Sequence, residues 1–234
     1  MKFHTLTKQK LGFTLAEVLI TLGIIGIVAA MTIPVLMTNY QKKTTATRAK
    51  KAYSELLQAI KLSENDNESM ESWNVGETSS IENTKKYVEK YIMPYYKGLT
   101  LCSEGLDGVN HKCGASLSAH GANYLTLNGT EIAFLYRPND GIYVIIDVNN
   151  GAKPNKLGYD AFYFKTNENF ELRPFGWYNG ITREAILNSY TYNNNGAEYT
   201  LECRKMKNEN DNYRHACTAL LVLDNWEFKK DYPW

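Results

Sequence analysis

The first chemically unusual residue of this chain is a carboxylate inside a long apolar run. Glu17 is the only charged residue between Phe13 and Tyr40. A carboxylate near the centre of a bilayer costs roughly 2.5–3.5 kcal/mol on insertion scales, and less near a helix end, where it reaches the headgroups. Carboxylates in such positions usually have a partner, and no cation lies within the run to provide one.

A cut in the backbone would supply the missing cation. Hydrolysis of the peptide bond between Gly12 and Phe13 creates a new α-amino group one helical turn from Glu17. The carboxylate then lies at a helix N-terminus, where the helix dipole stabilises an anion. The amine of one copy of the chain can equally pair with Glu17 of a neighbouring copy. On this hypothesis Glu17 is an assembly signal that a proteolytic cut activates.

The apolar run itself predicts a membrane-spanning helix. Phe13 to Met37 comprises 25 residues, about 37 Å as an α-helix, whereas a hydrocarbon core is about 30 Å thick. A buried helix of a soluble domain is disfavoured because apolar residues cover every side. A secretory signal peptide with a small-residue cleavage site at Val28–Ala30 is an alternative. Glu17 and the continuation of the run through Leu36 count against it.

Residues 10–17, KLGFTLAE, resemble the processing site of type IV prepilins and of the related pseudopilins of type II secretion. The shared features are a short basic leader, glycine before the cut, an aromatic residue after it, glutamate five positions in, and a proline, Pro34, in the long apolar helix. The resemblance implies that a prepilin peptidase cuts after Gly12, at a site that admits no side chain there. It also implies that the Phe13 amine is methylated and that the apolar helices, through Glu17 and Pro34, assemble into a filament core.

Two features of this segment allow more than one interpretation. Pro34 removes a backbone hydrogen bond, which is either ordinary tolerance in a membrane helix or a device that lets the helix loosen in a filament. The count of flanking cations, three in residues 1–12 and five in residues 41–51, favours a cytoplasmic C-terminal side. The leader motif implies the opposite orientation, with the N-terminus in the cytoplasm, and we let it override the count.

One loop in the rest of the chain has the composition of a metal site. Asp147, Asn149 and Asp160 offer hard oxygen ligands, and two glycines between them allow tight turns. Calcium takes six to eight oxygens from such loops, but the spacing is not that of an EF-hand. The alternative is a strand connection whose Asp and Asn side chains bond to their own backbone. We therefore expect no cofactor other than calcium, which the resemblance favours slightly, since some pseudopilin heads carry a calcium loop.

The four cysteines fall into two local pairs, Cys102 with Cys113 and Cys203 with Cys217. An even number beyond a membrane segment indicates disulfides in an oxidising compartment. Four reduced, buried thiols are the alternative. A zinc site that uses His111 is disfavoured because no C-x-x-C pair occurs.

Charge and motifs exclude two classes of function. The formal net charge of +1 is uneven, and residues 62–234 carry −6. An acidic body offers no basic surface to phosphate backbones, so we expect no nucleic-acid partner. The sequence has no H-E-x-x-H, G-x-S-x-G, P-loop or G-x-G-x-x-G motif, and the pair His215 and Cys217 is near only in sequence, so we expect no enzyme. The 17 tyrosines suit exposed interaction surfaces.

The elements that must position these residues divide the chain into four predicted segments. They are a cytoplasmic leader (1–12), a transmembrane and assembly helix (13–37), an amphipathic continuation of that helix (38–64), and an extracytoplasmic α+β head with a C-terminal tail (65–234). In the continuation, apolar residues recur every three or four positions from Ala46 to Ile60, which predicts packing on a sheet. Alternating segments and Asn-Gly or Asp-Gly turns between 123 and 172 predict an antiparallel meander. We also expect helices at 81–96 and 181–190, and a loop from Cys102 to Cys113.

Together these features predict a pilin-like structural subunit with a single membrane span. Its expected partners are the prepilin peptidase, other pilin or pseudopilin subunits, the inner-membrane assembly machinery and the membrane itself. Its expected location is the inner membrane and then an extracytoplasmic pilus or pseudopilus. The alternative is a monomeric membrane-anchored or secreted binding protein whose head does the work. The choice between major pilin, minor pilin and pseudopilin stays open.

Overall fold

The computed structural model describes residues 12, 14–105, 113, 121–194, 197–204 and 214–234. The chain forms two compact units, Met1–Lys42 and Lys43–Trp234, which we describe separately. Helix α1, Leu15–Asn67, runs through both. The first unit is the N-terminal part of this helix and the residues before it, and the second is an α+β body. This long N-terminal helix with an antiparallel sheet is the architecture that the sequence predicts.

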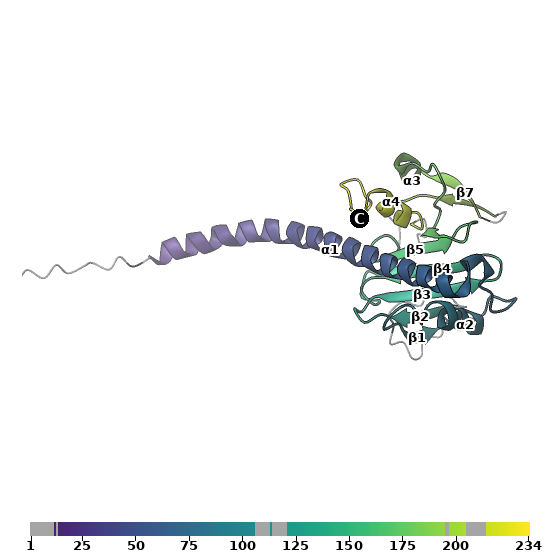
Figure 1. Cartoon of the computed structure of the whole chain (residues 1–234). Coiled ribbons are helices and arrows are strands. Elements are labelled where there is room, and N and C mark those ends of the chain that lie inside the picture. The colour runs from purple at the N-terminus through teal and green to yellow at the C-terminus, as the bar shows by residue number, and fades with distance from the viewer. Residues whose placement is uncertain (1–11, 13, 106–112, 114–120, 195–196, 205–213) are drawn as a thin grey trace, which may run out of the picture. The chain divides into compact units, whose positions relative to one another are not determined.

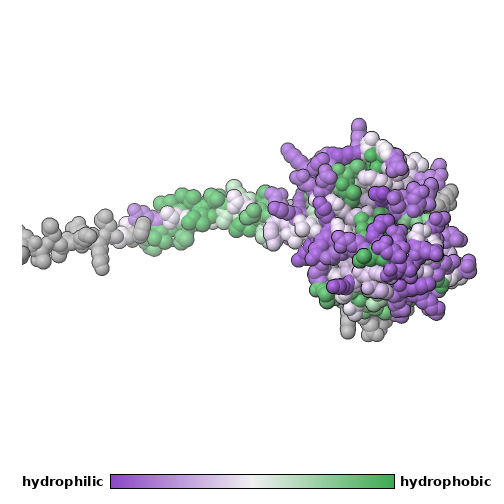
Figure 2. All heavy atoms as spheres, viewed as in Figure 1, coloured by the Kyte–Doolittle hydropathy of each residue, from purple (hydrophilic) through white to green (hydrophobic). Residues whose placement is uncertain are grey.

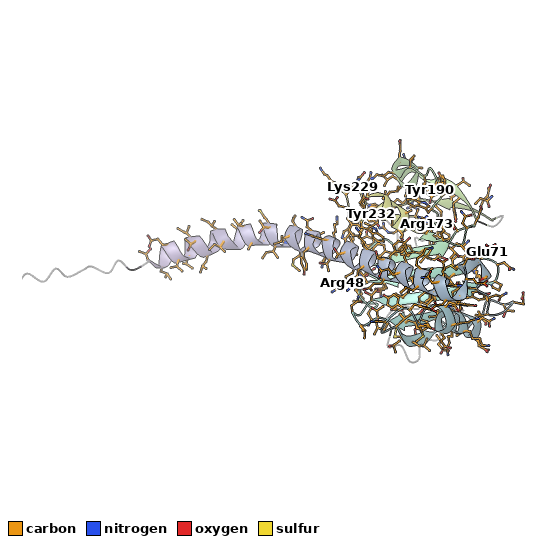
Figure 3. All side chains as sticks on the ribbon, in the orientation of Figure 1. Arg48, Glu71, Arg173, Tyr190, Lys229 and Tyr232 are labelled. Carbon is orange, nitrogen blue, oxygen red and sulfur yellow. A yellow bond between two sulfur atoms is a disulfide. The ribbon has the colours of Figure 1, made fainter. Side chains whose placement is uncertain are left out.

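The part of α1 in the second unit packs through one stripe of small and apolar side chains. The predicted stripe is confirmed, because its members Ala46, Ala49, Ala52, Leu56 and Ile60 are buried. Small side chains let the helix lie close to the sheet, and larger half-buried neighbours fix its position. The Tyr53 ring stacks on Phe164 of the sheet with centroids 4.6 Å apart, and Arg48 (Figure 3) donates to the Val148 carbonyl at 3.3 Å.

Helix α1 ends where the sequence predicts, in the polar run Asn65–Asn67. The Asn67 side chain donates to the Ser63 carbonyl at 3.2 Å, and Glu68 then takes a positive φ of 63°. A left-handed residue after the last helical turn is a common way to end a helix. A short 3₁₀ turn, Met70–Ser72, follows.

Helix α2 spans Ile81–Tyr91, and the Ser80 hydroxyl caps it by accepting from the Asn83 N–H. The predicted helix extended to Tyr96, which is wrong. Pro94 explains the difference, since proline has no N–H for the helical hydrogen bond and its ring clashes with the preceding turn. Residues 92–95 form turns instead.

The sheet is a six-stranded antiparallel meander in the order β1-β2-β3-β4-β5-β6 (Figure 1). Its strands are β1 Thr100–Glu104, β2 Ala122–Leu125, β3 Glu131–Arg137, β4 Gly141–Asp147, β5 Ala161–Thr166 and β6 Leu172–Pro174. The last five confirm the predicted meander. Strand β1 was predicted as part of a loop, and a register shift between Leu101 and Ser103 interrupts its pairing. This irregularity weakens the alternating pattern by which a strand is recognised.

The C-terminal tail adds two short helices and a hairpin. They are α3 Arg183–Asn188, β7 Tyr190–Asn194, β8 Ala197–Leu201 and α4 Cys217–Leu223. Helix α3 falls inside the predicted range 181–190, whereas the hairpin was not predicted. The Tyr232 hydroxyl donates to the Gly158 carbonyl at 2.7 Å, so the end of the chain is fastened to the loop between β4 and β5.

Most described tyrosines of the second unit stabilise its core instead of forming an exposed surface. The buried ones are Tyr87, Tyr91, Tyr96, Tyr124, Tyr136, Tyr143 and Tyr232. Around α2 they form an aromatic cluster in which Tyr87 stacks on Tyr136 at 5.1 Å. These buried tyrosines contribute to the core, so they are not part of an exposed interaction surface. Tyr178, at 41 % exposed, is the one large apolar or aromatic side chain of β5, β6 or the tail that the described structure leaves exposed.

Candidate processing and assembly site

Helix α1 begins with reciprocal hydrogen bonds between Thr14 and Glu17. The Thr14 backbone N–H donates to Glu17 Oε2 at 2.8 Å, and the Glu17 N–H donates to Thr14 Oγ1 at 3.2 Å. The Thr14 hydroxyl also donates to Glu17 Oε2 at 2.8 Å. This arrangement is a capping box, which satisfies N–H groups that have no partner inside the helix. The carboxylate therefore has hydrogen-bond donors in its own chain before any cut.

The capping role of Thr14 was missed from the sequence, although a signal was present. Thr14-Leu15-Ala16-Glu17 directly precedes the apolar run and fits the S/T-x-x-E pattern of a capping box. Both partners lie after the bond between Gly12 and Phe13, so hydrolysis of that bond leaves them in the same product. The capping box bonds the carboxylate to Thr14, which would be the second residue of the new chain.

Gly12 has no structural need to be glycine in the described chain. A Cβ built at this position meets no heavy atom within 4 Å, and its φ is not in the left-handed region. A requirement for glycine here would therefore come from a partner and not from folding. Phe13, the other residue of the predicted cut, lies outside the described residues.

The helix after this cap presents an apolar surface on every side within the first unit. Its large side chains from Leu15 to Met37 are all exposed, and Figure 2 shows them as a nearly continuous hydrophobic stretch. By length and composition, this part of α1 can cross a membrane, and none of its apolar window is buried by other described residues. An uncovered apolar surface of this kind needs lipid or other protein around it.

Pro34 lies inside helix α1 and does not end it. Its missing N–H removes one helical hydrogen bond. The Thr38 hydroxyl donates back to the Pro34 carbonyl at 2.9 Å, and Thr21 and Thr32 make similar bonds to carbonyls one turn earlier. Threonine hydroxyls are thus satisfied inside the helix, as a membrane-spanning segment requires.

The three predicted calcium ligands meet in one hydrogen-bond network on the loop between β4 and β5. The Asn149 N–H donates to Asp147 Oδ1 at 3.0 Å, and the Asn149 side-chain amide donates to Asp160 Oδ2 at 3.0 Å. Asp160 also accepts from the backbone N–H groups of Asn155 and Lys156. Asp160 therefore bonds to its own loop, as the alternative interpretation expected.

The same loop contains three buried oxygens that have no hydrogen-bond donor. They are Asp147 Oδ2, Asn149 Oδ1 and Asn150 Oδ1. Buried polar atoms without partners are uncommon and require an explanation, such as a missing ion. Asn150 was not singled out from the sequence. Within the described residues, no group of three or more His, Cys, Asp or Glu side chains is arranged to hold a metal ion, so a cation here would rely on amide and carbonyl oxygens.

Both expected local cysteine pairs are disulfides in the structure. Cys102 and Cys113 have Cα atoms 5.7 Å apart, and Cys203 and Cys217 have Cα atoms 4.7 Å apart. The second disulfide also supports the loop between β4 and β5. Gly158 has a φ of +77°, and a Cβ there would come within 2.5 Å of the Cys217 Cβ. Glycine at this position lets the loop pack directly on the disulfide.

No arrangement of catalytic side chains was found in the described part of the chain. His215 is half-buried between the rings of Tyr163 and Phe175, with centroids 5.6 and 5.7 Å away. Cys217, its neighbour in sequence, is committed to the disulfide with Cys203. His4, His111 and His120 lie outside the described residues.

Comparison with known proteins gives two matches that divide the chain near Pro34. The model of the prokaryotic N-terminal methylation motif matches residues 7–33. This motif is the type IV prepilin signature, and it contains the predicted cut, the capping box and most of the apolar run. The model of a family of unknown function (DUF6613) matches residues 35–234. No curated protein and no solved structure matches the chain.

Proposed function

Because the chain belongs to the DUF6613 family of unknown function and carries the type IV prepilin signature at its N-terminus, we propose that it is a pilin-like structural subunit that assembles into a type IV pilus or secretion pseudopilus. A prepilin peptidase cuts after Gly12, and the Phe13 amine is methylated. The subunit is held in the inner membrane by α1, with its N-terminus on the cytoplasmic side. The machinery of assembly then transfers the helix from lipid into a filament.

The observation that carries this proposal is the capped Glu17 at the end of an uncovered apolar helix. The capping box holds the carboxylate on Thr14, the residue that directly follows Phe13 in sequence. The apolar side chains that follow have no cover within the described structure. In a filament, neighbouring helices would cover them, and the ion pair between Glu17 of one copy and the amine of another would set the register. Glycine at position 12 is explained by the peptidase, since the chain itself does not need it.

A membrane-anchored binding protein that stays monomeric is the competing function. Both functions use the same anchor, so only assembly distinguishes them. We expect filaments sheared from the cell surface, or the pseudopilus complex extracted with its membrane platform, to contain this chain without its leader. If the chain is found only as single copies in the membrane fraction while other pilins are recovered in filaments, the competing function is correct.

We also propose that the loop between β4 and β5 binds calcium. The three oxygens without donors, on Asp147, Asn149 and Asn150, support a hard cation, because calcium accepts carboxylate and amide oxygens together. The loop is joined to the end of the chain through the Tyr232 hydroxyl and Gly158. Bound calcium would therefore stabilise the contact between this loop and the C-terminal tail.

Calcium should raise the melting temperature of the full-length chain and release measurable heat on titration. A ligand that binds only the folded state at about 100 times its Kd adds roughly 2.7 kcal/mol of stability, or about 5–10 °C for a domain of this size. The Asp147→Asn variant should lose the response, and Glu71→Gln, an exposed acidic residue outside the loop (Figure 3), should keep it. No heat with calcium, and no shift in melting temperature, would refute the site.

Without calcium, the same carboxyl should make stability depend on pH. Burial raises the pKa of Asp147 to about 6, although hydrogen bonds from backbone N–H groups lower it in part. A raised pKa means that the folded state binds the proton of Asp147 more tightly than the unfolded state does. The resulting contribution to the free energy of unfolding is fully present below about pH 4, and it is lost as the pH rises through about 6. In the presence of a chelator at pH 7.5, Asp147→Asn should increase the free energy of unfolding by roughly 1–3 kcal/mol, which raises the melting temperature by about 2–8 °C. At pH 4 the same substitution should change the melting temperature little. Equal effects at both pH values would contradict this.

A further inference from the structure

A groove on the second unit is lined by aromatic rings and by several asparagine side chains. It has a volume of about 580 Å³ and lies between the β5–β6 turn, the segment after β6, and strand β7. This volume falls within the roughly 300–1,000 Å³ of small-molecule sites. The lining of the groove includes no residue of the methylation motif or of the calcium loop, and neither proposal above accounts for it.

The walls of the groove combine flat apolar rings with hydrogen-bonding groups. Trp177 and Tyr178 line it after β6, and Tyr192 lines it from β7. Tyr178 is 41 % exposed, and its ring lies 5.8 Å from that of Tyr190 (Figure 3). Tyr190 is anchored in turn, because its hydroxyl donates to the Gly176 carbonyl at 2.8 Å. The aromatic wall is therefore held in place by packing behind it.

Five asparagines also line the groove: Asn139, Asn167, Asn169, Asn179 and Asn193. Asn167 is structural, since its Oδ1 accepts from the N–H groups of Asn169 and Glu171 and so shapes the turn. Within the described residues, the side-chain amides of Asn139, Asn169 and Asn179 make no hydrogen bond, nor does the Trp177 indole N–H. These three asparagines are exposed, and each amide offers two donor hydrogens and an acceptor oxygen to a ligand that displaces water from the groove.

The charges that line the groove balance one another. Lys165 and Asp140 are paired at 2.7 Å and are almost completely buried, and the Tyr143 hydroxyl donates to the other Asp140 oxygen at 2.6 Å. Arg173 pairs with Glu171 at 3.0 Å, and Glu168 is the remaining charged residue of the lining. A lining without excess positive charge does not select a phosphate or sulfate. The ion pair between Lys165 and Asp140 is already ordered, so little conformational entropy of these two side chains is lost when a ligand binds.

We propose that this groove binds a neutral oligosaccharide. A sugar ring has an apolar C–H face that fits against Trp or Tyr, and its hydroxyls donate and accept hydrogen bonds in equal measure. The exposed Tyr178 and the half-buried Trp177 supply the amphipathic rings, and Asn169 and Asn179 supply paired donors and acceptors. A peptide segment would also meet aromatic rings, but it would leave several free amides unmatched, because its backbone offers only one donor and one acceptor per residue.

The test uses the full-length chain in a zwitterionic detergent, since detergents with a maltose or glucose headgroup would compete for the groove. The chain is applied to arrays of neutral, N-acetylated, sialylated and sulfated oligosaccharides and to a peptide array. The retained oligosaccharide is then titrated in solution. Binding is measured on dispersed subunits, so the result does not depend on whether the chain assembles into filaments.

We expect neutral or N-acetylated oligosaccharides to be retained. Tyr178→Ala and Asn179→Ala should each weaken the solution Kd by about tenfold or more. Leu127→Ala, which truncates an 85 % exposed side chain on the β2–β3 turn outside the groove, should leave Kd unchanged, and unchanged melting temperatures show that the variants fold. Retention of no oligosaccharide, of anionic ones alone or of peptides alone would overturn the proposal, as would a Kd that both groove variants leave unchanged.

Discussion

The Gly12→Val variant should accumulate as uncut precursor. Gly12 is exposed at the start of α1, and a side chain there meets nothing in its own chain, so folding and membrane insertion should be unaffected. The branched side chain would instead clash inside a peptidase site that the prepilin resemblance implies to be closed around glycine. A clash worth about 1.4 kcal/mol in the transition state slows cleavage about tenfold, and we expect at least this loss. Immunoblots of membrane fractions resolve precursor from product by the mass of the leader.

Gly26→Val is the matched control for this effect. It places the same side chain inside α1, also where a Cβ meets no described atom, but beyond the cut. Its leader should be removed at the normal rate. Normal processing of Gly12→Val would show that cleavage does not require glycine at position 12. Equally slow removal of the leader from both variants would indicate a general defect in membrane insertion.

Glu17→Val should enter the membrane normally and fail to assemble. Removal of the carboxylate makes the apolar run more hydrophobic, which favours insertion, but it removes the group that we propose as the partner of the Phe13 amine in a neighbouring subunit. We expect the amount of this chain in sheared filaments to fall about tenfold or more, which corresponds to a loss of roughly 1.4 kcal/mol or more per subunit contact. Quantitative immunoblots of filament and membrane fractions measure both quantities.

Two further variants separate the charge of Glu17 from its role in the helix cap. Glu17→Gln keeps a side chain that can complete a capping box but removes the charge, so it should assemble as poorly as Glu17→Val. Thr14→Val removes the capping hydroxyl, which costs about 0.5–2 kcal/mol of helix stability, yet leaves the carboxylate, so filaments should still form. The reverse pattern, with Gln assembling and Thr14→Val failing, would assign Glu17 to capping and refute the ion pair.

Much of the fold follows from local patterns in the sequence. The apolar stripe from Ala46 to Ile60 predicted which side of α1 packs on the sheet, because a helix buries residues three and four apart. Alternation and turn residues predicted β2 to β6, because each of these strands pairs with its neighbour in sequence. Helix α2 was too long in the prediction, since the effect of Pro94 was underestimated. Patterns that depend on one element or one tight turn were therefore reliable.

Features that depend on contacts between distant segments could not be predicted in the same way. The β7–β8 hairpin was missed, and so was β1, whose pairing is irregular. The groove was also missed, because its walls come from four segments that only the fold brings together. The capping box of Thr14 and Glu17 is different, since its pattern was visible in four consecutive residues.

The N-terminus of the protein in its native membrane tests the central claim most directly. The chain is purified from cells without a tag at its N-terminus, and its first peptide is sequenced by tandem mass spectrometry. We predict that the peptide begins at Phe13 and carries a methyl group on its α-amine. A terminus at Met31 would show that a signal peptidase cuts after Ala30, and an intact Met1 would show that no cut occurs. Either of these results would contradict the pilin-like function.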